Sequence, residues 1–345
     1  MQKVVVHSAT INRIALTAET DDVDASVLDL DLPATAERIC ARIKESAARM
    51  GKRGAVVAIS GGIDSSVCAA LSSRALGREH VFFLILPERD SSPKSGRLGL
   101  MLADHLNVEH LVVDIAPTLE AIGCYRWGGE AIRAVFPEYT DAWKNKIVIA
   151  GGLERGINYH KLVVESPDGR RQEKRLGPKE YLQIVAAQNF KQRIRKTLEY
   201  FHADRLNYLV IGTPNRLEYD QGFFVKNGDG AADMKPIAHL YKTQVYAMAR
   251  HLGLPVEVVT ARPTTDTFSL EQGQDEFYFA LPYEKMDLAL WAKNNGRPAR
   301  ELAAALEITE QRAELVYRDI DTKRRTTRFL HARPDLVESV DEIAK

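Results

Sequence analysis

The 345-residue sequence lacks the features that mark several large classes of protein. Its 47 Lys and Arg residues equal its 47 Asp and Glu residues, so the formal net charge is zero, whereas domains that neutralise nucleic-acid phosphates carry a basic excess. The longest strongly apolar run, at 81–86, is far shorter than the ~20 residues of a membrane-spanning helix. We therefore expect a soluble globular protein that binds neither nucleic acid nor a membrane.

The sequence has only three cysteines, Cys40, Cys68 and Cys124, and they are widely spaced. Without a CxxC pair they indicate neither a disulfide framework nor a zinc knuckle, and a reducing compartment fits best. The nine histidines show no HExxH spacing or other metal-binding pattern. The N-terminal residues become polar too early for a secretory signal, so we expect a cytoplasmic location.

Short apolar runs alternate with amphipathic segments through much of the chain. This order predicts strands at 55–59, 81–86, 111–115 and 208–212, and helices at 37–50, 67–76, 95–106 and 240–252. Unbroken apolar strands that alternate with helices are typical of a parallel sheet covered on both faces. We predict an α/β fold, a doubly wound parallel sheet with flanking helices. Its ligands should bind beyond the carboxyl ends of the strands, near the loops at 60–66, 87–95 and 212–233.

Two segments fall outside this alternation. Residues 1–30 are typical of a short β-rich extension. Residues 124–178 contain an expected β-hairpin, with strands at 159–164 and 172–176 and the turn SPDG at 166–169. We thus divide the chain into an N-terminal extension, 1–35, and one main domain, 36–345, with an insertion at 124–178.

One loop has a composition typical of phosphate binding. It is Ser60-Gly61-Gly62-Ile63-Asp64-Ser65-Ser66, between an expected buried strand and the start of a helix. Adjacent glycines let backbone N–H groups approach an anion, the helix N-terminus favours negative charge, and serine hydroxyls can donate hydrogen bonds. The GK[ST] ending of a Walker A loop is missing. Because a bare carboxylate would repel phosphate, Asp64 fits best as a ligand of Mg²⁺. The alternative is an ordinary strand-to-helix turn capped by Ser and Asp.

The loop resembles the SGGxDS signature of the N-type ATP pyrophosphatase superfamily, whose members cleave ATP to AMP and pyrophosphate. Other segments resemble one branch, the NAD synthetase family. They are NFKQRIR at 189–195, GTPNRLE at 212–218, GFFVK at 222–226, GDG at 228–230, RPTTD at 262–266, QDE at 274–276 and DTKR at 321–324. The resemblance covers roughly residues 36–333, leaves 124–178 unmatched, and implies an adenine nucleotide alpha hydrolase-like sheet.

The resemblance implies ATP-dependent amidation of the nicotinate carboxylate of deamido-NAD. ATP adenylates this carboxylate with release of pyrophosphate, and ammonia then displaces AMP. By the same resemblance, Asp64 and Glu218 bind Mg²⁺ and act with Lys242 in catalysis. The positions that match ATP contacts are Ser60, Gly61, Gly62, Asp64, Ser65, Ser66, Thr213, Lys242 and Thr264, and those that match deamido-NAD contacts are Arg193, Lys226, Asp233 and Lys323. The family's members are homodimers, which implies the same assembly here.

Two departures from the family pattern concern the substrates. Thr322 stands where the family has His or Tyr before Lys323, which alters one expected contact. Glutamine-dependent relatives carry a large N-terminal glutaminase domain with a catalytic cysteine, whereas only residues 1–35 precede the core here. The implied nitrogen source is free ammonia, or ammonia from a separate glutaminase.

Alternatives remain open at the level of the sequence. An amide ligase with the same adenylating chemistry could act on a different carboxylic acid. A tRNA-thiolating enzyme would need sulfur-carrying cysteines or a basic RNA-binding surface, and the sequence offers neither. A catalytically inactive regulator would not need its site residues retained together, namely Asp64, Glu218, Lys226, Asp233 and Lys242. At single positions, Lys226 and Asp233 could form a structural ion pair, and the basic residues within 189–196 could form a solvated helix face.

Overall fold

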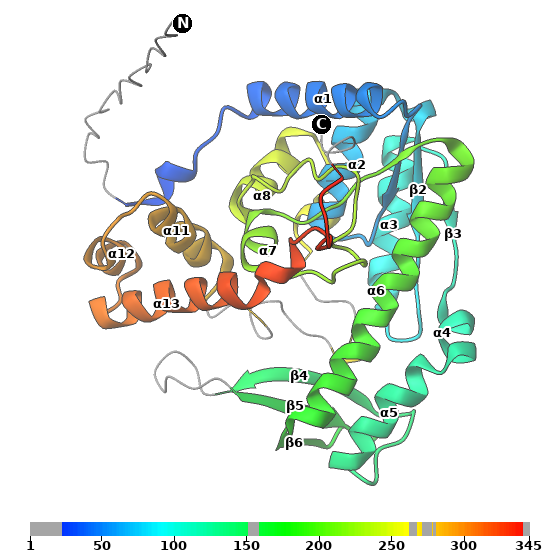
Figure 1. Ribbon diagram of the computed structural model, residues 1–345, viewed down its shortest axis with the longest axis vertical. Helices are drawn as coiled ribbons and strands as arrows, with labels where there is room; N and C mark the ends of the chain where they lie inside the picture. Colours follow the sequence, from blue (N-terminus) through cyan, green and yellow to red (C-terminus); the bar gives the residue numbers. More distant parts are fainter. Residues whose placement is uncertain (1–22, 151–158, 262–267, 271–277, 279–280, 341–345) are drawn as a thin grey trace, which may run out of the picture.

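The computed structural model describes residues 23–150, 159–261, 268–270, 278 and 281–340. Within these ranges a four-stranded parallel sheet has the order β3-β2-β1-β7. Its strands are β1 (Ala55–Ala58), β2 (Val81–Ile85), β3 (His110–Val112) and β7 (Leu209–Val210). The register pairs Ala55 with both Val81 and Leu209, so the loops that follow β1 and β7 leave the same edge of the sheet. The predicted parallel sheet with flanking helices is confirmed (Figure 1).

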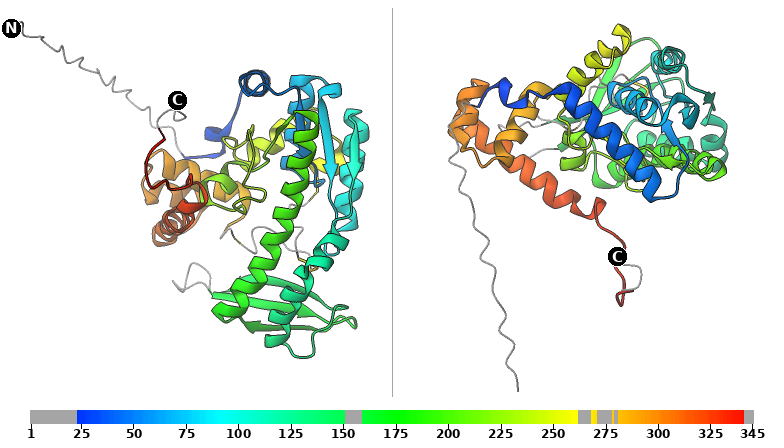
Figure 2. Two further views of the ribbon diagram at one scale, coloured as in Figure 1. Left: turned by 45° about the vertical axis from the view of Figure 1, so that its right-hand side comes forward. Right: turned by 90° about the horizontal axis from the view of Figure 1, so that it is seen from above.

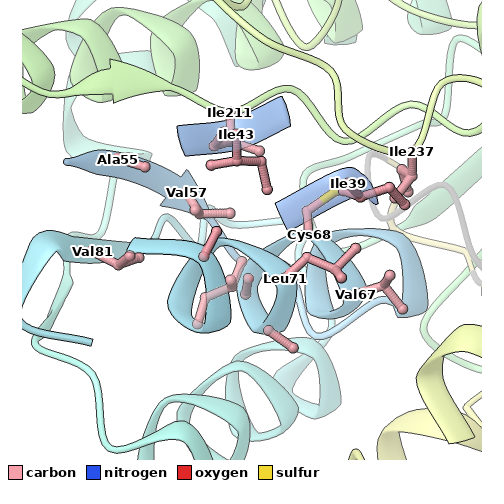
Figure 3. Packing of buried hydrophobic residues seen from close by; sticks show 14 of the residues in the cluster. Ile39, Ile43, Ala55, Val57, Val67, Cys68, Leu71, Val81, Ile211 and Ile237 are labelled. Atoms are coloured by element: carbon pink, nitrogen blue, oxygen red, sulfur yellow. The ribbon is translucent and has the colours of Figure 1, made fainter. Parts of the chain in front are cut away.

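Successive side chains of β1 enter two different hydrophobic clusters, which is why helices cover both faces of the sheet. Val57 packs in a cluster with α1 (Leu32–Arg49), α2 (Ile63–Leu76), α3 (Pro93–Leu106) and α8 (Lys242–His251). Val56 packs in a cluster with α4 (Ala116–Ile122), α5 (Cys124–Val135) and α6 (Pro178–Leu206). Figure 3 shows Ile43 of α1 and Leu71 of α2 around Val57. Each fully buried Val or Leu contributes about 1.5–3 kcal/mol, so the loop after β1 begins from a firmly held strand.

A second, antiparallel sheet lies within the segment 124–178. Its strands are β4 (Lys144–Ala150), β5 (Tyr159–Glu165) and β6 (Arg171–Arg175). The predicted hairpin is confirmed as β5 and β6, whereas β4 has no counterpart among the predicted strands. Ile132 of α5 and Ile184 of α6 pack on Ile147 and Leu162 of this sheet. The 29-residue helix α6 therefore joins both sheets, as the left view of Figure 2 shows.

A further cluster of buried residues unites the C-terminal helices with η1 and α7. It contains residues of η1 (Ala25–Leu28), α7 (Arg216–Gln221), α11 (Tyr283–Asn294), α12 (Ala299–Leu306) and α13 (Glu310–Thr327). The hydroxyl of Thr327 donates to the carbonyl of Gln221 over 3.3 Å, so α13 ends against α7. η4 (Arg328–Leu330) follows at once, and the remaining short helices are η2 (Arg78–His80) and α9 (Val256–Val259).

Several predicted boundaries differ from those in the structure. Helix α3 begins at Pro93 rather than 95 because the Ser92 side chain accepts a hydrogen bond from the backbone of Lys94. The third strand, predicted at 111–115, ends at Val112. The β-rich prediction for 1–30 is wrong at its described end, where Asp24 caps η1 by accepting from the Ser26 N–H, and 1–22 lie outside the described residues. None of the helices in the described ranges has both the length and the apolarity to cross a membrane.

Candidate active site

The loop between β1 and α2 forms a strand-to-helix turn built on two glycines. Gly61 has φ +76°, a conformation that only glycine adopts easily, and Gly62 is the N-cap of α2 without a side-chain cap. The first N–H groups of a helix lack intrahelical partners, so this turn offers backbone donors and a positive helix end to an anion. The loop thus has the form expected of a phosphate site.

The three serines of the loop have different roles. Ser60 is exposed at the edge of the loop and its hydroxyl accepts from the Gly62 N–H over 3.3 Å. Ser65 and Ser66 donate to the Gly62 carbonyl over 3.0 and 2.8 Å, and Ser66 is fully buried. The last two hydroxyls therefore shape the turn, and Ser60 is the serine placed to meet a ligand directly.

Gly61→Ala is expected to lower kcat/KM for ATP about 100-fold, the effect of a misplacement near 1 Å. A Cβ at Gly61 would lie 2.5 Å from the Ser95 carbonyl oxygen and 2.8 Å from Leu98 Cβ, in a backbone region that L residues disfavour. Gly96 in α3 is the matched control, because no atom lies within 4 Å of its Cβ position. Gly96→Ala should keep full activity; wild-type kinetics for the Gly61 variant would contradict the tight fit of the loop.

Asp64, in the first turn of α2, is held by two groups from distant parts of the chain. The buried Lys242 ammonium, 1% exposed, forms an ion pair with Asp64 Oδ2. Asn215 Nδ2 donates to Asp64 Oδ1 over 3.0 Å. Burial alone would lower the pKa of Lys242, but Asp64 and Glu218 together raise it, so the amine stays charged. The structure thus joins Asp64 and Lys242 as the sequence predicts.

Glu218 completes this centre. Its Oε2 accepts from the Asn215 N–H over 3.1 Å, and Asn215 Oδ1 accepts from the Leu217 and Glu218 N–H groups, which makes a reciprocal cap for α7. Burial and the nearby Asp64 carboxylate raise the pKa of Glu218 to about 8. In the part of the chain that is described, no three His, Cys, Asp or Glu side chains gather as a complete metal cage. The Asp64 and Glu218 carboxylates lie close enough to affect each other, and a cation bound beside them would stabilise both.

Asn215 and Asp287 are two further residues of the site, and neither is among the site residues predicted from the sequence. The N-x-x-E spacing of Asn215 and Glu218 is a recognisable capping signal. Asp287 of α11 is fully buried, and its carboxylate accepts from the N–H groups of Lys242 (3.2 Å) and Thr243 (2.7 Å). It fixes the start of the helix that carries Lys242, and nothing in its local sequence indicates this role.

Asp287→Asn is expected to destabilise the protein more at pH 5 than at pH 7. Burial raises the pKa of Asp287 to about 6 from 3.8, so between these values the native wild type binds a proton that the unfolded chain does not. The wild type therefore gains about 1 kcal/mol as the pH falls from 7 to 5, and the amide cannot. Urea unfolding at both pH values measures the difference, and a gap that narrows at pH 5 would contradict this expectation.

The predicted deamido-NAD residues fall into separate places. Arg193 Nε donates to the Lys226 carbonyl (3.2 Å), and Lys226 Nζ donates to the Phe329 carbonyl (3.0 Å), so these two residues are neighbours. Asp233 Oδ2 instead accepts from the Val210 N–H (2.7 Å). The described contacts therefore do not support the alternative of a Lys226–Asp233 ion pair.

Three further residues are predicted to contact a substrate, namely Lys323, Thr213 and Thr264. Lys323 Nζ donates to Asp319 Oδ2 (2.6 Å) and to the Tyr278 carbonyl (2.7 Å), and burial lowers its pKa. Thr213 lies three residues beyond the end of β7 and is partly exposed. Thr264 lies outside the described residues. Among the described residues, the positions predicted to contact ATP thus lie closer together than those predicted to contact deamido-NAD.

The solvated-face alternative for residues 189–196 is wrong for its two lysines. Lys191 is 2% exposed and pairs with Glu88 Oε1 (3.1 Å) and Asp90 Oδ2 (2.6 Å). Lys196 is 5% exposed and pairs with Glu199. A buried charge needs such partners, and the Lys191 pairs fasten the loop after β2 to α6.

The chain is similar to several known proteins over most of its length. A family model described as NAD synthase matches residues 35–127 and 143–329, which include 143–178, where sequence motifs alone showed no correspondence. The NH(3)-dependent NAD(+) synthetase of Rhizobium meliloti (strain 1021) is 53% identical over 333 residues, covering 96% of this chain and 98% of that protein. Its counterpart from Mesorhizobium japonicum is 54% identical over 318 residues, covering 92% of this chain and 100% of that protein.

A solved structure shows the same fold. The NH3-dependent NAD synthetase from Campylobacter jejuni, in complex with the nitrate ion, has a TM-score of 0.58 at 24% identity, covering 90% of this chain and 100% of that chain. The family model alone matches well over half of the sequence. The chain therefore belongs to the NAD synthase family.

Proposed function

We propose that this chain amidates the nicotinate carboxylate of deamido-NAD with ATP and ammonia, giving NAD, AMP and pyrophosphate. The observation that carries the proposal is the position of Asp64 at the start of α2, held by Lys242 and Asn215 beside a glycine turn. Relatives that align over almost the whole chain bear the name of this activity. The C–N ligase chemistry needs no side-chain nucleophile, in agreement with a site made of donors, cations and carboxylates.

The physical task is to turn a carboxylate, a poor electrophile, into an acyl-adenylate. Pyrophosphate gains negative charge as it leaves, so donors fixed at that point lower the barrier. The N–H groups at residues 60–66 and the charged Lys242 ammonium are such donors, and Lys242 needs no reorganisation because the pair with Asp64 already fixes it. Arg193 and Lys226 supply positive charge for the acceptor dinucleotide.

The donor set at Asp64 and Glu218 fits magnesium. Mg²⁺ prefers hard oxygen ligands and is commonly bound by one or two carboxylates together with substrate phosphates. Burial and the nearby Asp64 carboxylate both raise the pKa of Glu218, and a cation bound at the two carboxylates would stabilise their charged forms. When bound, the ion would supply charge neutralisation at the departing pyrophosphate.

We also propose a homodimer in the cytoplasm that takes free ammonia, or ammonia from a separate glutaminase. The resemblance to a family of homodimers supports this assembly. The three cysteines are buried free thiols, which fits a reducing compartment.

The proposal is tested by mixing the purified chain with ATP, Mg²⁺, ammonium and deamido-NAD. One NAD should form for each AMP and each pyrophosphate, and glutamine should not replace ammonium. The matched panel contains nicotinate mononucleotide and simple carboxylic acids as acceptors. Absence of NAD with the correct substrates would overturn the proposal, and AMP formation with another acid would favour the different-acceptor ligase.

A further inference from the structure

A cavity of about 500 Å³ lies beside α7, away from the active site. It is lined by Arg216, Tyr219 and Asp220 of α7, by Lys235 and His239 of the loop before α8, and by His331 after η4. Residues at i, i+3 and i+4 share one face of a helix, so the three α7 residues point together. Glu218 lies on a different side of the same helix, where it approaches Asp64. Helix α7 therefore separates the cavity from the catalytic centre.

The charge balance of this cavity is positive. The Asp220 carboxylate accepts two hydrogen bonds from Arg324, at 2.6 and 2.7 Å, and also lies 3.7 Å from Arg216 Nε, so one carboxylate faces two guanidinium groups. Within the described part of the chain, the side chains of Lys235 and His239 have neither a hydrogen bond nor an ion pair with a carboxylate. Burial and the nearby Lys196 lower the pKa of Lys235, and the Asp229 carboxylate offsets only part of this effect. A bound anion would relieve this repulsion.

An aromatic wall stands next to the cations. The Tyr219 and His331 rings meet edge to face with centroids 4.8 Å apart, and Phe224 lies 5.1 Å from His331. Lys235 Nζ lies 5.4 Å from the Tyr219 ring centroid. Aromatic faces bind planar rings, while Lys and Arg bind phosphate.

We propose that this cavity binds a mononucleotide, at a second site distinct from the catalytic one. Its volume falls in the range of small-ligand pockets, roughly 300–1,000 Å³. Arg216, Lys235 and His239 would hold the phosphate, and Tyr219 with His331 would contact the base. His331, which directly follows η4, thereby becomes part of a ligand site.

The test uses AMP as the probe in equilibrium dialysis with the full chain. With saturating deamido-NAD present to fill the acceptor site, the wild type is expected to bind two AMP per chain, one at the ATP site and one in the cavity. Lys235→Met, which keeps the aliphatic stem and removes the charge, should weaken one of these two sites at least 10-fold. The KM for ATP and kcat should stay within twofold of wild type, because Lys235 lies outside the active site. Lys179→Met, at an exposed position at the start of α6, is the matched control and should bind two AMP normally.

Inorganic phosphate as a second probe tests the aromatic wall. AMP should bind this site at least 10-fold more tightly than phosphate. Any of three results would overturn the proposal. They are a single AMP site in the wild type, equal binding of phosphate and AMP at the second site, and two intact AMP sites in Lys235→Met. A Lys235→Met variant that loses ATP turnover would also overturn it, since the cavity would then belong to the catalytic site. Deamido-NAD contains an AMP unit, so filling the acceptor site with it keeps that site out of the AMP count. A chain that forms no NAD but loses one AMP site in Lys235→Met would show the proposed function to fail while this proposal stands.

Discussion

Asp64→Asn should lower the rate of AMP and pyrophosphate formation by about 10³-fold, the loss expected when a main electrostatic group at a reacting phosphate is removed. The asparagine side chain has nearly the same size but no charge, so it can neither hold a cation nor pair with Lys242. It would also place an amide beside the Asn215 amide that now donates to Asp64 Oδ1. The expected defect is in catalysis, with ATP binding weakened to a smaller extent.

Folding must be measured beside the rate, because Asp64 compensates a buried ammonium. Asp64 is 16% exposed, so its replacement should cost about 1–3 kcal/mol of unfolding free energy and leave the fold intact. Asp104→Asn, an exposed change near the end of α3, is the matched control and should alter neither quantity. An Asp64→Asn variant with more than a tenth of wild-type activity would remove Asp64 from the proposed metal site.

The parts of the molecule that could be predicted from the sequence are those encoded by neighbouring residues. The apolar run of β1, followed at once by two glycines and Asp64, predicts both the strand and the turn, and the structure has both. The hairpin of β5 and β6 was predictable for the same reason, since its turn contains Pro and Gly169 at φ +83°. The family assignment, carried by many such strings in order, is confirmed.

Contacts between distant residues could not be predicted in this way. Asp64 and Lys242 are 178 positions apart, and only the packing of α8 beside α2 brings them together. The burial of Lys191 depends on Glu88 and Asp90, about a hundred positions away, so a helix pattern rich in Lys and Arg suggested a solvated face instead. Asp287 is a similar case, because its role at the start of α8 exists only in the packed structure.

The second large expected effect concerns the partner of Asp64. Lys242→Met should lower the adenylation rate about 10²- to 10³-fold, because the variant keeps the apolar stem but loses the fixed positive charge at the departing pyrophosphate. It also leaves the Asp64 and Glu218 carboxylates without the cation that now lowers the pKa of Glu218. Removing one member of a buried pair should cost about 3–5 kcal/mol at pH 7, measured by urea unfolding. Lys44→Met, at an exposed site on α1, is the control.

The double variant Asp64→Asn with Lys242→Met measures how strongly these two side chains stabilise each other. If the two side chains stabilise the fold mainly through each other, the loss in the double variant should be smaller than the sum of the single losses by about 1–3 kcal/mol. Adenylation should remain as low as in either single variant, since the charges act as one unit on the same leaving group. Strictly additive losses of unfolding free energy would show that Asp64 is not the main partner of the buried Lys242 ammonium. Glu218 would then be the carboxylate that stabilises this charge.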